Sequence, residues 1–538
     1  MRVRPRHPIL RPALVAVAAL AAASGFAPAA AARTVPPQQP MRVLIVPRIT
    51  PTQLERLAGR GSVGLLVPGI GPTTNLRQAL AALVRGEVEN ARLGGVPSGP
   101  PLIGADAVTG FPTGRPAIIL ALPPKGRPLS NDKRYYVAVV GRGYEPHSLL
   151  VSKATRIPGL VAIQDIAPTA LQRPARDLRY THAANAAQTV QRLDARITAN
   201  NQLKLPSLIA IAVLVGFLAI LRPRAALPAL PAALLGSLGL GFLGPTSIPV
   251  LVVVFCLSIV LGGLVLERIC SSEERLLVVF GAVLVAYLIA MAVDPTSASI
   301  NPLGPTQNSR FFGIGNQVET LLLGPVLAGA ALAGRRFGIV GYLVVAALAF
   351  VAVAENSLGA DAGGAGVLAV SLAVLGSRIG RLPRKGLLTS LGVGAVAVLA
   401  LFWVDQGQSR PNHMTSAFSH GLGGLLDVAR NRIPLAYSPA IHQWEFVGPF
   451  FLCFVVAAIL TLRGRQTPGR RDVLLAVIAA ACASLVINDS AAYVLVASIV
   501  TLVAIRCSPF RFAPLRPLSL RSPVVAPAPE LAAEPVRD

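Results

Sequence analysis

A series of long apolar segments runs from the region of Leu205 to that of Arg506. Most of them approach the ~20 residues that a helix needs to cross the hydrocarbon core of a bilayer. Lipid offers the backbone no hydrogen-bond partners, so apolar segments of this kind cross membranes as helices. The pattern predicts a polytopic α-helical membrane bundle over residues 205–508 with about eleven transmembrane helices. The expected segments are 206–221, 225–243, 248–266, 276–293, 318–334, 337–354, 361–377, 387–404, 446–462, 472–487 and 491–506.

The composition agrees with a membrane protein. Of the 538 residues, 53% are hydrophobic and only 14% are charged, and the mean hydropathy is +0.62. These values exclude an ordinary soluble enzyme. The formal net charge of +25 could indicate a nucleic-acid partner, but the arginines lie between apolar segments and form no basic stripe with interleaved aromatic residues. We expect membrane lipids as partners and no nucleic acid.

Arginine clusters mark every second connection between the apolar segments, and the positive-inside rule assigns such connections to the cytoplasm. An exported N-terminal part followed by an odd number of crossings also places the C-terminus inside, so two arguments agree. The sequence thus predicts a multi-pass membrane protein with an extracytoplasmic N-terminal domain and a disordered cytoplasmic tail over residues 509–538. The clusters are Arg222/Arg224, Arg268/Arg275, Arg335/Arg336, Arg378/Arg381/Arg384/Lys385, Arg463/Arg465/Arg470/Arg471 and Arg506/Arg511.

The N-terminal part differs in character from the bundle. Residues 1–32 combine a basic start, an apolar stretch and small residues near Ala32, which is typical of a signal peptide or of an uncleaved N-terminal anchor. In residues 40–200, strand-like apolar runs alternate with amphipathic helical patterns, so we expect a small extracytoplasmic α/β domain with a parallel sheet. The expected strands are 42–46, 62–67, 117–122, 135–140 and 160–166, and the expected helices are 51–61 and 76–85.

The five cysteines lie in or beside apolar segments, and none occurs between residues 33 and 200. The α/β domain therefore has no disulfide framework. The sequence has no Cys-x-x-Cys pair and no ligand spacing typical of a zinc site. We expect neither a metal nor a cofactor.

A polar run, Asn-Ser-Arg-Phe-Phe-Gly-Ile-Gly-Asn-Gln-Val-Glu-Thr, interrupts the apolar series at residues 308–320. Charged residues where a chain enters the membrane are costly and usually face a cavity or a partner. Further polar residues occupy the other connections predicted to lie on the outer side. The candidate substrate-binding residues are Arg310, Asn316, Glu319, Glu355, Asn356, Asp361, Asp405, Arg410, His413, Arg430, Arg432, Asn488 and Asp489.

Several of these residues also have a purely structural interpretation. Asn316 and Glu319 fit a capping box, Asp489 fits an N-cap, and the glycines of residues 359–366 would let helices approach closely. Arginines, however, suit bidentate contacts with phosphate or carboxylate groups. Together with carboxylates and histidine, they predict an outward-facing pocket for an anionic envelope substrate such as a lipid-linked glycan. Catalytic residues stay unknown, and transfer and translocation both stay open.

Two regions of the α/β domain resemble the alkaline phosphatase superfamily. Residues 157–171, Ile-Pro-Gly-Leu-Val-Ala-Ile-Gln-Asp-Ile-Ala-Pro-Thr-Ala-Leu, are similar to its late D-I-A-P-T-L element, and residues 42–46 with 64–74 are similar to its first strand and nucleophile region. The resemblance implies a metal-binding Asp after the first strand, where this chain has Pro47, and a nucleophile near Thr73 or Thr74. The Asp-His pairs expected before the late element are missing. We therefore expect a truncated, non-catalytic version of that fold.

The whole chain resembles a group of uncharacterised bacterial multi-pass membrane proteins with such an ectodomain. The bundle motifs that carry this resemblance are Phe-Phe-Gly-Ile-Gly-Asn at 311–316, Gly-Ala-Asp-Ala-Gly-Gly at 359–364 and Asn-Asp-Ser at 488–490. It implies an architecture but no activity. The leading hypothesis is the handling of an anionic envelope substrate. A metal-dependent phosphohydrolase on a membrane anchor and a solute transporter are the alternatives, and inverted repeats with broken helices would favour the transporter.

Overall fold

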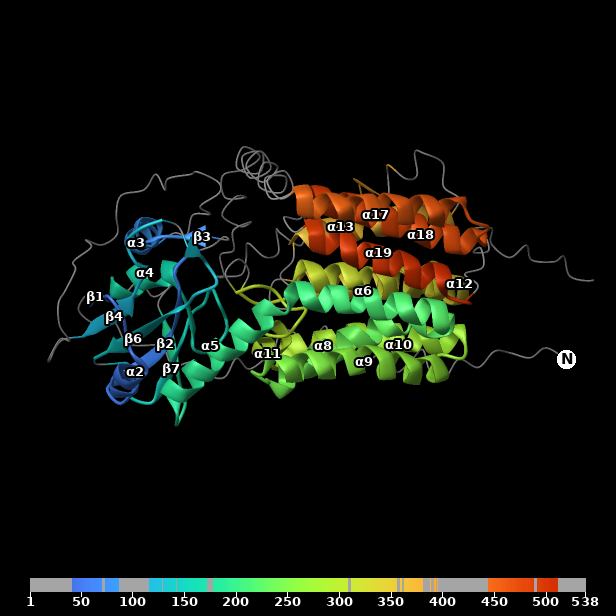
Figure 1. Cartoon of the computed structure of the whole chain (residues 1–538). Coiled ribbons are helices and arrows are strands. Elements are labelled where there is room, and N and C mark those ends of the chain that lie inside the picture. The colour runs from blue at the N-terminus through green and yellow to red at the C-terminus, as the bar shows by residue number, and fades with distance from the viewer. Residues whose placement is uncertain are drawn as a thin grey trace, which may run out of the picture.

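The computed structural model contains an α/β domain and a helical bundle (Figure 1). The last helix of the domain runs directly into the first helix of the bundle. The residues that the structure describes are 41–69, 73–86, 116–127, 129–141, 143–171, 178–307, 311–355, 359, 362–380, 388, 391–392, 394, 444–487 and 491–510. The predicted signal peptide or anchor lies outside them, as does nearly all of the predicted tail.

The α/β domain is built on a seven-stranded sheet with the order β1-β4-β6-β2-β7-β9, and β8 also pairs with β2. The sheet is mixed, so the expected parallel sheet is wrong. Strand β6 pairs antiparallel with both β4 and β2, whereas β1–β4 and β2–β7 are parallel. The strands are β1 (Arg42–Val46), β2 (Gly61–Val67), β4 (Ala117–Ala121), β6 (Tyr135–Val140), β7 (Ser148–Val151), β8 (Leu160–Ala162) and β9 (Arg179–His182), while β3 (Thr73–Thr74) and β5 (Leu129–Ser130) form a second small sheet.

The reversal between β4 and β6 has a local cause. The connection at residues 122–134 contains the short strand β5 and the Pro-Pro-Lys-Gly sequence at 123–126, but no helix among its described residues. A parallel neighbour requires a crossover, usually a helix, whereas a short connection returns the chain antiparallel. The apolar runs therefore predict where the strands lie but not their directions.

Helices cover both faces of this sheet. On one face lie α2 (Pro51–Ala58) and α5 (Ala186–Gln202), which bury Leu54, Leu57, Val190 and Ile197 against the strands. The other face is covered by α3 (Leu76–Arg85), the 3-10 turn η2 (Ile163–Asp165) and α4 (Ile166–Ala170). The expected helix over 76–85 is confirmed, and Asn75 and Gln78 form a capping box at its start. The result is a three-layer α/β domain with two apolar cores.

The bundle contains several helices long and apolar enough to cross a membrane. Four described helices meet that criterion: α6 (Lys204–Leu221), α9 (Ile248–Ile269), α10 (Glu273–Val293) and α12 (Asn316–Ala354). Side chains such as Ile220 and Val293, 80% and 75% exposed, would face lipid. The count of eleven crossings stays a prediction, because most of 387–404 lies outside the described residues. The other helices are α7 (Pro223–Ala226), α8 (Ala229–Leu243), α11 (Pro295–Ser299), α13 (Ala362–Ile379), α17 (Trp444–Arg463), α18 (Pro468–Ile487) and α19 (Ala491–Cys507).

Helix α12 reverses direction near its middle. A straight helix of its 39 residues would be about 58 Å long, yet the N–H of Ile314, just before it, donates to the carbonyl of Gly359, just after it, over 2.8 Å. Gly338 provides the break with φ 67° and ψ −156°, a conformation that glycine adopts readily. The two predicted segments 318–334 and 337–354 are therefore two antiparallel arms.

Several arginines lie at the end of the bundle opposite to the one at which α5 leads into α6. Arg335 and Arg336, beside the reversal, form ion pairs with Glu273 and Glu274 at the start of α10. Arg378 likewise pairs with Asp472 over 3.0 Å. These exposed pairs add little stability, but their positions confirm that the arginine-rich connections of the described residues share one end.

Candidate functional site

The end of the bundle that faces the α/β domain carries the described candidate residues. Helix α5 of the α/β domain leads into α6 of the bundle with only Leu203 between them. Arg196 of α5 reaches across to the bundle, where its guanidinium donates to the carbonyls of Gly241 and Ile300 and to Ser297 Oγ. Burial lowers the pKa of Arg196, and the neighbouring Asp294 opposes that shift. Arg196 therefore ties the α/β domain to the bundle ends of α8 and α11.

Lys204 makes a second connection about two helical turns further along the chain, at the start of α6. The residue is only 2% exposed, and its ammonium group donates to the carbonyls of Asn301, at 3.0 Å, and Gly304, at 2.5 Å. The side chain of Asn301 accepts from Ser237 Oγ at 2.7 Å and from the N–H of Leu303 at 3.0 Å. A buried charge is tolerated when hydrogen bonds satisfy it, so this network anchors the connection between α11 and α12.

Two phenylalanines of the predicted polar run pack against the α/β domain. Phe311 is 8% exposed and belongs to the apolar core formed by α2, α5 and the sheet, together with Ile300. Phe312 packs at the edge of that core, and the guanidinium carbon of Arg156 lies 4.0 Å from the centre of its ring. The sequence stretch that we expected to line a pocket is therefore, in part, a domain contact.

The first turn of α12 holds two of the candidate residues. Glu319 is 1% exposed, and Asn316 is half-buried. The expected capping box is wrong, because Asn316 is the first residue of the helix and the N-cap is Gly315, which has no side chain. Asn316 instead contributes its carbonyl, which accepts from Thr320 Oγ1 at 2.7 Å. An acidic group in a first turn is favoured by the helix dipole.

The second arm of α12, after Gly338, runs back to the end of the bundle at which the helix begins. Its C-cap is Glu355, which is half-buried, and the Ile314–Gly359 hydrogen bond ties the two ends of the helix pair together. The structure thus brings Asn316, Glu319 and Glu355 to one end of the bundle. The remaining candidate residues lie outside the described part of the chain: Arg310, Asn356, Asp361, Asp405, Arg410, His413, Arg430, Arg432, Asn488 and Asp489.

Sequence reasoning missed Arg196 and Lys204. Both had a signal. Lys204 is a charged residue directly before the first apolar segment, 206–221. Arg196 lies eight residues earlier, a spacing that places both on the same face if the helix is continuous. A basic residue near a membrane boundary is usually explained by the positive-inside rule, so neither residue stands out in the sequence as a contact between the domain and the bundle. Their carbonyl partners become visible only in the folded chain.

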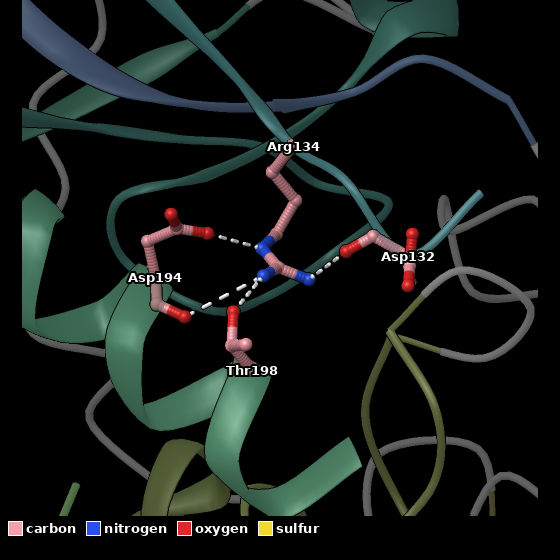
Figure 2. Close-up of polar contacts among 4 residues, drawn as sticks. All are labelled: Asp132, Arg134, Asp194 and Thr198. Carbon is pink, nitrogen blue, oxygen red and sulfur yellow. Dashed lines mark hydrogen bonds and ion pairs between the residues drawn. The ribbon is translucent and has the colours of Figure 1, made fainter. Parts of the chain in front are cut away.

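A third buried contact holds α5 to the sheet (Figure 2). The guanidinium of Arg134 donates to Asp194 Oδ1 at 2.6 Å, to Thr198 Oγ1 at 2.6 Å and to the carbonyl of Asp132 at 2.8 Å. Its side chain is 6% exposed, and that of Asp194 is 35% exposed. Because Asp194 and Thr198 both belong to α5, the cluster orients that helix against the start of β6.

The superfamily-like elements of the α/β domain have structural roles here. Asp165 is buried and accepts a hydrogen bond from Ser152 Oγ, and its carbonyl accepts from Thr169 Oγ1 at 2.6 Å. Thr169 in turn accepts from the N–H of Leu178 at 2.8 Å. The Asp-Ile-Ala-Pro-Thr sequence therefore ties η2 and α4 to the β7 side and to the start of β9.

The resemblance implies a metal ligand at position 47 and a nucleophile at position 73 or 74. Pro47 is exposed after β1, and Thr73 is exposed while Thr74 is buried in β3. Within the part of the chain that the structure describes, no group of three or more His, Cys, Asp or Glu side chains could hold a metal ion.

We expect the purified full-length protein to contain no stoichiometric zinc and to hydrolyse no phosphodiester, because Pro47 stands where the resemblance would imply a metal-binding carboxylate. Elemental analysis and a chromogenic phosphodiester assay measure both. Thr73→Ala and Thr74→Ala serve as the matched variants. Hydrolysis that either change abolishes would show an active phosphohydrolase.

Comparison of the chain with protein-family models, with curated proteins and with solved structures found no match in any of the three.

Proposed function

We propose that the chain is a multi-pass protein of the bacterial plasma membrane that handles an anionic cell-envelope substrate, such as a lipid-linked glycan, by transfer or translocation. The α/β domain would lie outside the cytoplasm and the C-terminus inside. The substrate would bind at the bundle end that faces the α/β domain, where Arg310 and the other candidate arginines would contact its phosphate or carboxylate groups.

The observation that carries this proposal is the burial of Glu319 in the first turn of α12. A carboxylate at the edge of a membrane-spanning helix costs several kcal/mol unless partners compensate for the lost water. Packing alone would favour an apolar residue there, as at the neighbouring Val318 and Leu321, which are 1% and 0% exposed. The retention of a carboxylate supports a polar task at this place.

Arg310, nine residues before Glu319 in the same run, supplies the positive charge that the proposed substrate requires. Guanidinium groups bind phosphate and carboxylate with paired hydrogen bonds. The combination of an arginine with Asn316, Glu319 and Glu355 would let a site contact both the anionic group and the hydroxyls of a glycan. This mixed chemistry favours a sugar-linked anion over a purely apolar lipid.

The proposal predicts that Arg310→Ala and Glu319→Gln each lower function at least tenfold, which corresponds to about 1.4 kcal/mol. Function would be measured by complementation in a strain that lacks the protein, beside thermal stability in detergent. Glu274→Gln at the opposite end is the control, because Glu274 forms an exposed ion pair with Arg336 and such pairs contribute little.

The two measurements separate substrate binding from a structural role. Loss of function with unchanged stability supports binding, whereas a parallel loss of stability shows that the charge holds the bundle together. Arg310→Ala and Glu319→Gln proteins that are both stable and fully functional would remove these residues from the site and end the proposal.

The orientation is testable with two isosteric cysteine variants. Ser130, in β5 of the α/β domain, and Ser271, between α9 and α10, are both exposed. In a cysteine-free background in intact cells, we expect a membrane-impermeant maleimide to label Ser130→Cys and to spare Ser271→Cys until the cells are broken. The opposite pattern would place the α/β domain in the cytoplasm and exclude an extracytoplasmic site.

A further inference from the structure

The segment that precedes α12 is held by the α/β domain rather than by the bundle alone. We propose that Phe311, Phe312 and Arg156 act as positioning residues, through which the α/β domain sets the place of the first turn of α12. This inference rests on the proposed function in so far as Asn316 and Glu319 belong to the binding site. It assigns to the α/β domain a mechanical role in place of a catalytic one.

The α/β domain contacts Phe311 through apolar packing and Phe312 through a cation–π interaction. Phe311 is 8% exposed and lies in the core of the α/β domain, in the same apolar cluster as Val190 and Ile197 of α5. The Phe312 ring lies under the guanidinium of Arg156, 4.0 Å from its centre, at a distance typical of a cation–π contact. A change in the α/β domain that moves α5 or Arg156 must therefore move this pair of rings.

The backbone of Arg156 supports a specific role for its side chain. Its φ is 55°, in the left-handed region that glycine and asparagine occupy more easily than other residues. The turn geometry alone would thus favour Gly or Asn at this position. An arginine at a strained position that contacts Phe312 indicates that the side chain, and not the turn, determines the residue.

The connection from Phe312 to α12 has little freedom. The N–H of Gly313 donates to Ser299 Oγ at 3.0 Å, and that of Ile314 donates to the carbonyl of Gly359 at 2.8 Å. A Cβ added to Gly315 would lie 3.1 Å from Pro305, so the chain passes tightly against the α11–α12 connection. Asn316, the first residue of α12, follows directly, and a displacement of Phe312 is therefore transmitted to the helix.

The first residues of the same α11–α12 connection, Ile300 to Gly304, are also held by hydrogen bonds. Arg196 donates to the carbonyl of Ile300, and Lys204 donates to those of Asn301 and Gly304. Arg196 and Arg156 both belong to the α/β domain, so that domain holds the connection both before and after residues 301–307. A ligand that bound one arrangement of the α/β domain more tightly than another would consequently alter the site at α12, and the reverse coupling would be equal in free energy.

Hydrogen–deuterium exchange of the full-length protein tests the inference without reference to activity. Arg156→Asn removes the cation and suits the left-handed backbone, and Phe312→Leu keeps an apolar side chain but removes the ring. We expect the amides of residues 311–323 to exchange at least tenfold faster in both variants, while those of α10 stay unchanged. Arg60→Asn, at an exposed arginine of the same domain, is the matched control, and Arg156→Lys is expected to restore most of the protection.

Unchanged exchange at 311–323 in both variants would overturn the inference, whatever their activity. Faster exchange confined to 311–323 together with reduced complementation supports both the inference and the proposed function. Faster exchange with full complementation supports the positioning role and instead contradicts the placement of the substrate site at α12. Faster exchange throughout the protein would overturn the inference, because it would show general destabilisation.

Discussion

Gly241→Ala is expected to lower the apparent melting temperature of the purified protein by many degrees, or to prevent its accumulation in the membrane. A Cβ at this position would overlap the carbonyl oxygen of Ser297, which is backbone and cannot rotate away. Gly241 also provides the carbonyl that accepts from Arg196. Overpacking of this kind costs about 3 kcal/mol or more, and a lost hydrogen bond from a charged donor adds roughly 1.5–3 kcal/mol.

Gly239 provides the matched control for Gly241. It lies two residues earlier in the same helix, α8, and a Cβ there would meet nothing within 4 Å. Alanine is a better helix former than glycine by about 1 kcal/mol, so Gly239→Ala should be as stable as the parent protein or slightly more stable. Thermal unfolding in detergent, followed by gel filtration, compares the two. Equal melting temperatures for both variants would show that α8 and α11 do not pack as closely as described.

Gly61→Ala is expected to unfold the α/β domain and, through it, to loosen the start of α12. Gly61 begins β2, the central strand, and a Cβ there would overlap the carbonyl oxygen of Val139 and lie 3.0 Å from the Cα of Val140 on β6. The two strands cannot separate without breaking their ladder, so we expect a loss of about 3 kcal/mol or more.

Gly59→Ala is the control for this second change. Gly59 is the C-cap of α2 with φ −70°, and its nearest neighbours to a Cβ are backbone oxygens at 3.6 and 3.8 Å, which is ordinary contact. Limited proteolysis of the full-length protein reports the state of the α/β domain. Rapid cleavage within residues 41–200 is expected for Gly61→Ala only. A protease-resistant Gly61→Ala protein would contradict the β2–β6 pairing.

The sequence predicted many of the helices and strands, but it missed β7, β9 and α5, and the expected strand 160–166 ends at Ala162, after which the chain forms η2 and α4. Apolar runs such as 42–46 and 135–140 coincide with β1 and β6, and the run 206–221 coincides with most of α6, because burial of one stretch of chain depends mainly on its own side chains. The break between 318–334 and 337–354 was also predictable from Arg335, Arg336 and Gly338. Strand direction was not, since it depends on connections rather than on the strands.

The candidate site was predictable only in part. Glu319 and Glu355 stood out as charges beside apolar segments, and both lie at the bundle end that faces the α/β domain. The prediction that Asn316 caps the helix was wrong by one position, because the helix begins at Asn316 and its N-cap is Gly315. Helix ends are decided by local geometry to within a residue or two, and a capping pattern in the sequence cannot resolve that difference.

By itself, the sequence determined that the chain has a membrane bundle, an α/β domain and a basic bundle end, because hydropathy and charge act residue by residue. Only the tertiary structure decided that Phe311 enters the core of the α/β domain with Phe312 at its edge, and that Arg196 and Lys204 bind carbonyls of the α11–α12 connection. Contacts between residues 100 positions apart depend on how the two domains dock. No local pattern records that docking, since the partners are main-chain carbonyls, which every residue possesses.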